Sequence, residues 1–155
     1  MAFRLIDKYY IRLIIMKIKK YNYLPEDAKF IREQVFIREQ GFKVEFDDTD
    51  KYAVHLVAYD GAVPAGTCRY YKGQDGDTYV IGRVAVLKNM RGKHTGSLLL
   101  EEAQRQIAVA GGKYAELSSQ VSASEFYEKA GYTKTGEVYY DEFCPHIKMI
   151  KTLDK

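Results

Sequence analysis

The sequence predicts one domain of the mixed α+β class, in which strand and helix patterns alternate along the chain. The length of 155 residues suits a single domain, and we find no internal repeat, low-complexity tract or linker. The shares of hydrophobic residues (46%) and charged residues (29%) are typical of a soluble globular protein. The predicted order is strand, helix, three strands, helix, strand, helix and two strands. A parallel pair is therefore expected where a helix connects two strands.

The first half of the chain predicts one strand, one helix and a hairpin. Alternating apolar and basic residues indicate a strand over residues 16–23. Pro25 begins a helix that ends at Gly41. Its inward face carries apolar residues at helical spacing: Ala28, Ile31 and Val35. Two strands follow over residues 53–59 and 62–71, separated by a short glycine-containing hairpin signal.

The second half of the chain predicts four strands and two helices. The strands cover residues 80–86, 114–118, 132–139 and 146–152. The first helix begins at Leu98, ends at Gly111 and carries an apolar stripe: Leu99, Ala103, Ile107 and Ala110. The second helix covers residues 123–130 and is stopped by Gly131, because glycine readily adopts the left-handed conformation that ends a helix.

Composition limits the classes of partner. With 24 basic and 21 acidic residues the net charge is +3, which weakly favours anionic ligands. The basic residues are spread along the chain, so a nucleic-acid-binding domain ranks low among the interpretations. Cys68 and Cys144 are too few for a disulfide framework and form no C-x-x-C pair. We therefore expect reduced thiols, which fit a cytoplasmic protein.

The sequence contains no motif for a metal ion or a membrane span. The three histidines are widely separated, and the acidic residues 47–50 lack the glycine and distal glutamate of a calcium loop. We interpret residues 47–50 as a solvated or substrate-facing loop. Residues 1–15 have an apolar run too short for a membrane span or a signal peptide. They are either an appended extension or an upstream start, and the domain covers residues 16–155.

A basic turn between a strand and a helix is the part of the sequence that says most about a possible ligand. Residues 91–97, Arg-Gly-Lys-His-Thr-Gly-Ser, follow the strand over residues 80–86 and precede the helix. Such a turn offers unpaired backbone N–H groups, the positive end of the helix dipole and cationic side chains. This combination suits a phosphate or pyrophosphate. The alternative is an ordinary connection whose basic residues face solvent, because short glycine motifs often match by chance.

Two separated motifs resemble the GNAT superfamily of acyl-CoA-dependent N-acetyltransferases. Residues 91–96 look like the family's Q/R-x-x-G-x-G/A pyrophosphate loop. Residues 120–132, which contain Phe126 and Tyr127, are similar to its A-x-x-F-Y-x-x-x-G-F/Y helix. Three further stretches look like a bacterial subgroup of small, mostly unassigned GNAT proteins: residues 35–40, 45–47 and 145–149. The resemblance implies a mixed sheet of six to seven strands, with helices on both faces and a splayed central parallel pair.

The resemblance also implies acetyl-CoA, or another short acyl-CoA, lying between the two central parallel strands. The strand backbone would bond the pantetheine arm, and the basic turn would hold the pyrophosphate. The implied cofactor-binding residues are Val84, Ala85, Val86, Arg91, Gly92, Lys93, His94, Thr95, Gly96, Ser97, Gln120 and Tyr127. His94 stands where the family usually has its first loop glycine. A side chain there is unfavourable if the position needs a positive φ, unless the imidazole lies beside the phosphates and helps to neutralise them.

Tyr127 is the candidate catalytic acid. In the family the matching tyrosine lies near the thioester sulfur and protonates the leaving thiolate. A phenol, with a pKa of about 10, is protonated at neutral pH and can supply that proton. The alternative is that Tyr127 only packs, as most of the 14 tyrosines must.

Candidates for the catalytic base and for acceptor binding come from two regions of the chain. Glu39 and His146 are the candidate bases, since a carboxylate or an imidazole can take a proton near neutral pH. Glu45, Asp47 and Arg83 are the candidate substrate-binding residues. Each also has a structural interpretation: a solvated acidic loop, a packed histidine or a surface arginine. Gln120 could equally cap the next helix.

These observations favour an N-acetyltransferase that needs no metal. It would move an acetyl group from acetyl-CoA to a primary amine of a small molecule or peptide, by direct attack in a ternary complex. The alternative from another class is a non-catalytic acyl-CoA-binding or sensing module. No nucleic-acid or membrane partner is expected. The acceptor, the acyl chain preference and homodimerisation stay open.

Overall fold

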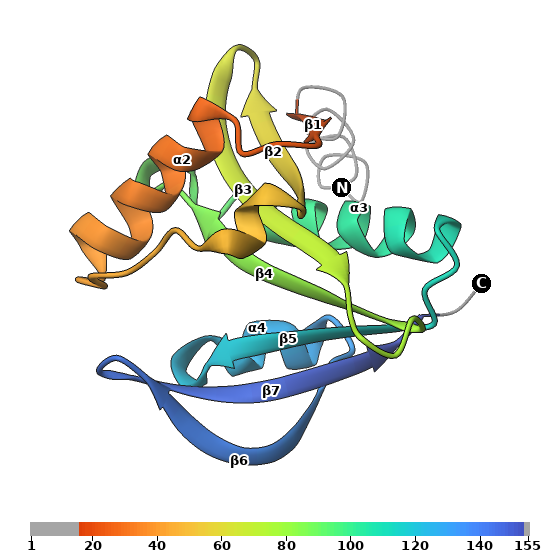
Figure 1. Cartoon of the computed structure of the whole chain (residues 1–155). Helices are drawn as coiled ribbons and strands as arrows, with labels where there is room; N and C mark the ends of the chain where they lie inside the picture. Colours follow the sequence, from red (N-terminus) through yellow and green to blue (C-terminus); the bar gives the residue numbers. More distant parts are fainter. Residues whose placement is uncertain (1–15, 154–155) are drawn as a thin grey trace, which may run out of the picture.

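A seven-stranded mixed sheet forms the centre of the protein. The computed structural model describes residues 16–153 (Figure 1). The strands are β1 (Met16–Tyr21), β2 (Val54–Asp60), β3 (Val63–Lys72), β4 (Thr78–Val86), β5 (Tyr114–Gln120), β6 (Thr133–Asp141) and β7 (Cys144–Thr152). They lie in the order β1-β2-β3-β4-β5-β7-β6, and the only parallel pair in this sheet is β4 with β5. The predicted α+β class, the strand number and the parallel pair are confirmed.

The described part of the chain contains three α-helices. They are α2 (Glu26–Arg32), α3 (Thr95–Val109) and α4 (Ser124–Lys129). The helix predicted from Pro25 to Gly41 changes geometry part of the way along, because α2 continues as a π-helical segment over Glu33–Glu39. The wider turn is visible in the hydrogen bond from Gln40 N to Val35 O, at 3.1 Å. Gly41 ends the segment with φ 83°, as predicted for this glycine.

The helices cover both faces of the sheet, as expected. Val57 and Tyr59 of β2 pack with Ala28, Ile31 and Val35 of the first helical stretch. The residues that alternate with them on β2 face the opposite core, which contains α3 and Tyr127 of α4: Leu56 and Ala58. Figure 1 shows α2 and α3 on opposite sides of the strands. The two cores fix both helical layers on one sheet.

The limits of α3 differ from the prediction at both ends. The helix begins at Thr95, so three residues of the basic turn form its first helical turn. Leu99, Ala103 and Ile107 are fully buried, as predicted, but Ala110 is exposed. The helix ends at Val109, and Gly111 then takes φ 95°. Ala110 therefore lies after the last helical residue and outside the buried stripe.

Three further sequence interpretations concern membrane spans, the cysteines and the first 15 residues. No helix within residues 16–153 is long and apolar enough to cross a membrane. The same residues contain two free cysteines: Cys68 is buried and Cys144 is half-buried. The predicted extension over residues 1–15 lies outside the described part of the chain.

Candidate active site between strands β4 and β5

Strands β4 and β5 are paired at one end only. Their register includes three residue pairs, and the last joins Val80 to Glu116. Beyond this point β4 pairs only with β3, and β5 pairs only with β7. Figure 1 shows the two strands diverging from their common end. The predicted splay of the central parallel pair is therefore confirmed.

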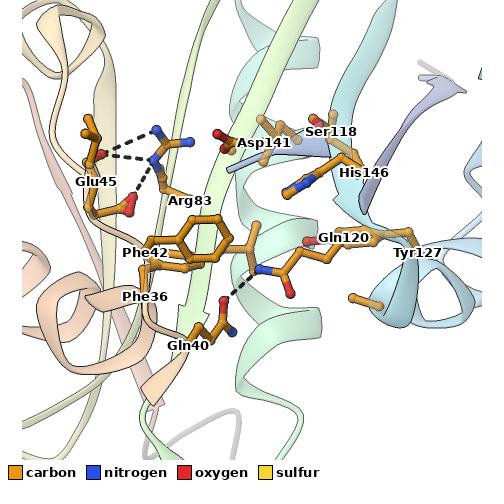
Figure 2. A pocket seen from close by; sticks show the side chains of 16 residues that line it. Phe36, Gln40, Phe42, Glu45, Arg83, Ser118, Gln120, Tyr127, Asp141 and His146 are labelled. Carbon is orange, nitrogen blue, oxygen red and sulfur yellow. Dashed lines mark hydrogen bonds and ion pairs between the residues drawn. The ribbon is translucent and has the colours of Figure 1, made fainter. Parts of the chain in front are cut away.

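A bulge in β4 accompanies the splay. The register between β3 and β4 shifts between Thr67 and Arg69, where β4 contains one residue more than β3. In this stretch Arg83 takes φ 52°, which is rare for a residue with a side chain. The bulge turns the following part of β4 and directs the Arg83 side chain toward the opening between the strands (Figure 2).

The opening holds a cavity of about 160 Å³. Six of the predicted site residues line this cavity: Glu45, Arg83, Val84, Gln120, Tyr127 and His146. They come from a loop, from β4, β5 and β7, and from helix α4, so the fold brings together segments that are about 100 residues apart. Figure 2 shows the Arg83, Gln120 and His146 side chains around the same space. The other predicted residues lie outside the cavity lining.

Tyr127 reaches the cavity from α4 and is only 9% exposed. Its ring packs edge-on against Phe126 at 5.0 Å and against Tyr132 at 6.0 Å between ring centroids. Burial raises the pKa of the Tyr127 hydroxyl well above its ordinary value. The phenol is therefore protonated at neutral pH and can only give a proton.

His146 is held in one orientation by three contacts. Its ring stacks on Tyr139, with 6.0 Å between ring centroids, and packs edge-on against Phe42 at 6.5 Å. Its Nδ1 lies 3.0 Å from the carbonyl oxygen of Cys144. Because a carbonyl can only accept, Nδ1 carries the hydrogen in this bond. In the neutral ring Nε2 then has the free lone pair, so His146 can accept a proton at that atom.

Glu45 is a buried carboxyl group on the cavity wall. Its Oε1 lies 2.5 Å from Nε of Arg83 and 3.7 Å from the guanidinium of Arg32. Burial raises the pKa of Glu45 to about 7, although the neighbouring arginines act in the opposite direction. Glu45 therefore changes its charge near neutral pH. It can hold a cationic group, or share a proton with one, inside the cavity.

Asp50 corrects part of the interpretation of residues 47–50 as a solvated or substrate-facing loop, whereas Asp47 and Asp48 are exposed as that interpretation predicts. Asp50 is buried, and its Oδ1 lies 2.7 Å from both Arg32 and Arg69. Burial opposes ionisation of Asp50, but the hydrogen bonds from these arginines outweigh it and lower the pKa to about 2. Asp47 binds Arg69 at 2.7 Å and Arg83 at 3.3 Å. Sequence reasoning missed the burial of Asp50, because the arginines that neutralise it are distant in sequence.

The basic turn lies at the N-terminus of α3, beside the cavity rather than in it. The first hydrogen bond of the helix runs from Leu98 N to His94 O, so the N–H groups of the first turn have no helical partner. The buried Thr95 hydroxyl also has no hydrogen-bond partner among the residues that the structure describes. His94 takes φ 61°, as a glycine would at this position. These donors fit the pyrophosphate of an acyl-CoA.

Arg91 and Glu39 form a surface ion pair. The guanidinium of Arg91 contacts both carboxylate oxygens of Glu39, at 2.6 and 2.7 Å, and its Nε donates to Val86 O. Hydrogen bonding to Arg91 lowers the pKa of Glu39, which makes this carboxylate a weaker base. The structure thus places Glu39 next to the basic turn and away from the cavity.

Ten further residues line the cavity that sequence reasoning had not selected. They are Phe36, Gln40, Phe42, Val44, Ile81, Gly82, Leu117, Ser118, Ala123 and Asp141. Gln40 accepts a hydrogen bond from Gln120 at 2.7 Å, which joins the end of the π-helical segment to the end of β5 (Figure 2). Phe36 and Gln40 belong to a stretch that resembles the bacterial subgroup, and this was the only signal in the sequence for them. The π-helical geometry that turns them inward has no clear sequence signature.

Comparison with known proteins identifies the family. A model of the GNAT acetyltransferase domain matches residues 22–153. The uncharacterised N-acetyltransferase YjcF of Bacillus subtilis strain 168 is 33% identical over 129 residues, which cover 81% of this chain and 91% of that protein. The crystal structure of a Lactobacillus plantarum protein is similar with a TM-score of 0.82 and 30% identity, over 89% of this chain and 98% of the other. A Pseudomonas aeruginosa acyl-CoA N-acyltransferase has the same fold, with a TM-score of 0.76 and 24% identity, over 88% and 99% of the two chains.

The fold and the opened strand pair are those of an acyltransferase. The chain belongs to the GNAT acetyltransferase family. Members of this family transfer an acyl group from a coenzyme A derivative to an amine acceptor, so the predicted superfamily is confirmed.

Proposed function

We propose that the protein is an N-acetyltransferase that moves an acetyl group from acetyl-CoA to a primary amine of a small molecule or peptide. One observation carries this proposal. The cavity between β4 and β5 is lined by a protonated phenol, Tyr127, and by an oriented imidazole, His146. An acid and a base in one cavity are what the reaction needs when both substrates are bound together.

The donor would lie along the open edge of β4. The backbone of Val84, Ala85 and Val86 would bond the pantetheine arm, and this part of β4 has no pairing with β5. The first turn of α3 would hold the pyrophosphate through the N–H groups of Thr95, Gly96 and Ser97. Gly92, Lys93 and His94 complete the turn. Arg91 would reach the phosphates from its pair with Glu39.

The chemical step would be a single displacement within the ternary complex. The amine nitrogen attacks the thioester carbonyl carbon, a C–N bond forms, and the C–S bond breaks. The leaving thiolate takes the hydroxyl proton of Tyr127. The acceptor enters as an ammonium group and would lose one proton to solvent before it attacks, and the attacking nitrogen then loses its second proton to Nε2 of His146. The products are the N-acetylated acceptor and coenzyme A, and solvent restores both protonation states.

The acceptor would be recognised on the side of the cavity formed by Glu45 and Arg83. The carboxylate of Glu45 would attract the incoming ammonium group, while Arg83 holds that carboxylate in place. Asp47 would act through Arg83, because its own oxygens are bound to Arg69 and Arg83. We place His146 ahead of Glu39 as the base, since Glu39 lies outside the cavity and is paired with Arg91.

Replacement of Tyr127 by phenylalanine tests the proposal. Phenylalanine keeps the ring packing and removes only the proton donor, so we expect kcat to fall about 100-fold, whereas the affinity for acetyl-CoA stays within about threefold. Thiol release from acetyl-CoA with a panel of primary amines gives kcat, and a thermal shift with coenzyme A gives the affinity.

The same experiment separates the proposal from its rival. A sensing module would bind acetyl-CoA and release no thiol with any amine. A Tyr127→Phe variant with unchanged kcat would remove Tyr127 from the mechanism. Tyr140→Phe is a matched control for the loss of an exposed phenol, because Tyr140 is 70% exposed and does not line the cavity.

A further inference from the structure

The turn between β6 and β7 is tied to the loop that follows the π-helical segment. The carboxylate of Glu142 accepts hydrogen bonds from Lys43 N at 3.0 and 3.1 Å and from Val44 N at 3.1 Å. Beside these bonds the rings of Phe42 and Phe143 pack at 5.0 Å between ring centroids. We call these five residues the clasp. It joins two parts of the chain that are almost 100 residues apart.

Both sides of the clasp continue into the cavity wall. On one side Phe42 and Val44 are themselves lining residues. On the other side Asp141, directly before Glu142, and His146, on the same hairpin, line the cavity as well. The clasp therefore closes the wall between the loop and the hairpin, and it sets how far apart they lie.

A second connection fixes the inner end of the same loop. Gln120 donates to Gln40 at 2.7 Å, as the dashed line in Figure 2 shows. The loop from Gln40 to Val44 thus forms part of the cavity wall, held to β5 at one end and to the β6–β7 turn at the other. The inner connection joins two side chains that line the cavity. The outer connection joins an exposed carboxylate to two backbone N–H groups, so it can open without disturbing the core.

Glu142 lies in the tight turn between β6 and β7, in a backbone conformation that is rare for a residue with a side chain. Glu142 takes φ 52°, a conformation that favours glycine and costs energy for a residue with a side chain. Hydrogen bonding to Lys43 N and Val44 N lowers the pKa of Glu142, so the carboxylate is charged near neutral pH. A strained residue whose charged side chain bridges two loops at a substrate cavity is a feature typical of ligand clamps.

We propose that the clasp closes the acceptor end of the cavity and determines which amines can enter. This inference rests on the proposed acyltransfer reaction. With the clasp closed, the small cavity lined by Phe36 and Phe42 takes a slender primary amine and keeps His146 in its orientation. Opening the clasp separates the loop from the hairpin, so small amines are held less well and bulkier amines gain access. Glu142 is a positioning residue, because its carboxylate reaches the loop backbone and not the reacting atoms.

Amide hydrogen exchange tests the clasp without any substrate. Glu142→Ala removes the acceptor of the Lys43 and Val44 N–H groups, so we expect these two amides to exchange about tenfold faster or more, as measured by NMR. Glu142→Gln keeps the size and one acceptor oxygen, and should give an intermediate rate. Glu137→Ala removes an exposed glutamate of β6 that has no ion pair among the described residues, so it should leave both amides unchanged. Unchanged exchange rates of the Lys43 and Val44 amides in Glu142→Ala would show that Glu142 does not hold the loop.

Steady-state kinetics test its role in acceptor selection. For Glu142→Ala we expect the KM for a small amine to rise about tenfold, whereas kcat and the KM for acetyl-CoA stay within about twofold. We also expect the preference for small over bulky amines to weaken. Equal effects on both KM values, or faster exchange with an unchanged amine KM, would contradict the gating role. If the wild-type protein acetylates no amine, the proposed function fails, while the exchange experiment still decides whether the clasp exists.

Discussion

Three residues of the described chain other than glycine take a positive φ: Arg83, His94 and Glu142. Each of them lies at a border of the candidate site. Arg83 lies in the bulge of β4, and His94 precedes the first residue of α3 in the basic turn. Glu142 closes the clasp. Side chains in this conformation are costly, and they persist where the surroundings hold them. The backbone strain of this protein is therefore concentrated around the cavity.

A pair of variants at His94 measures one part of that strain. His94→Gly and His94→Ala both remove the imidazole and its interactions, but only glycine adopts φ 61° readily. We expect His94→Gly to be more stable than His94→Ala by about 1 kcal/mol. Urea unfolding of the two variants gives the difference directly. Equal stabilities would mean that the left-handed conformation is not maintained in solution.

At the scale of elements, a buried ion network supports the connection between the helical stretch and β2. Arg32 comes from the end of α2, Arg69 comes from β3, and Asp50 lies in the loop between α2 and β2. Glu45 and Asp47 belong to the same loop, and of the two Glu45 lines the cavity. The network therefore fixes the loop against the sheet, and with it the residues that would bind the acceptor.

Asp50→Asn tests this support. The amide keeps the shape of the side chain but removes its charge, and two buried guanidinium groups lose a partner at 2.7 Å. We expect a loss of about 3 kcal/mol in the free energy of unfolding. Asp48→Asn is the matched control, since the Asp48 side chain is 92% exposed and should change stability by less than about 0.5 kcal/mol. Similar losses in both variants would show that burial of Asp50 is unimportant.

The elements also show how far the sequence could predict the structure. Apolar spacing identified the faces of α2 and α3, because burial of Ile31 or Leu99 needs only the period of a helix. The same spacing could not predict the π-helical segment, since its turns depend on the sheet beneath it. The partners of Asp50 were equally hidden, because Arg32 and Arg69 reach it only through the tertiary fold.

The candidate site was predictable only where its residues belong to a sequence motif. Resemblance to a family motif placed Tyr127, and the cavity contains it. The assignment of Glu39 as base rested on chain position alone, and the structure shows its carboxylate bound to Arg91. Asp141 and Glu142 lie in no motif, so only the approach of the hairpin to the loop reveals them.

At the scale of the whole molecule, two buried carboxyl groups give stability opposite dependences on pH. The folded-state pKa of Asp50 is lowered to about 2, so its contribution of about 2 kcal/mol is present above pH 4 and is lost as the pH falls through 2. Glu45 has a raised pKa of about 7. The folded state therefore binds one proton more than the unfolded state between pH 4.5 and 7, and stability falls as the pH rises across that window.

Glu45→Gln checks the second effect. The variant has no proton to lose at this position, so the decline in unfolding free energy between pH 4.5 and 7 should shrink by up to about 3 kcal/mol relative to the wild type. Urea titrations at half-unit pH steps give both curves. Parallel curves for the two proteins across this range would show that Glu45 is ionised throughout.

The three residue pairs that join β4 to β5 have a consequence for solubility as well as for chemistry. A strand edge with free hydrogen-bonding groups usually invites another protein chain and leads to aggregation. Here that edge faces inward, toward a slot bounded by side chains on both sides. We expect such a slot to accept a thin linear molecule more readily than the strand of a neighbouring protein. The fold would thus leave the hydrogen-bonding edge of β4 available to a small ligand, while the facing strand limits contact of that edge with other proteins.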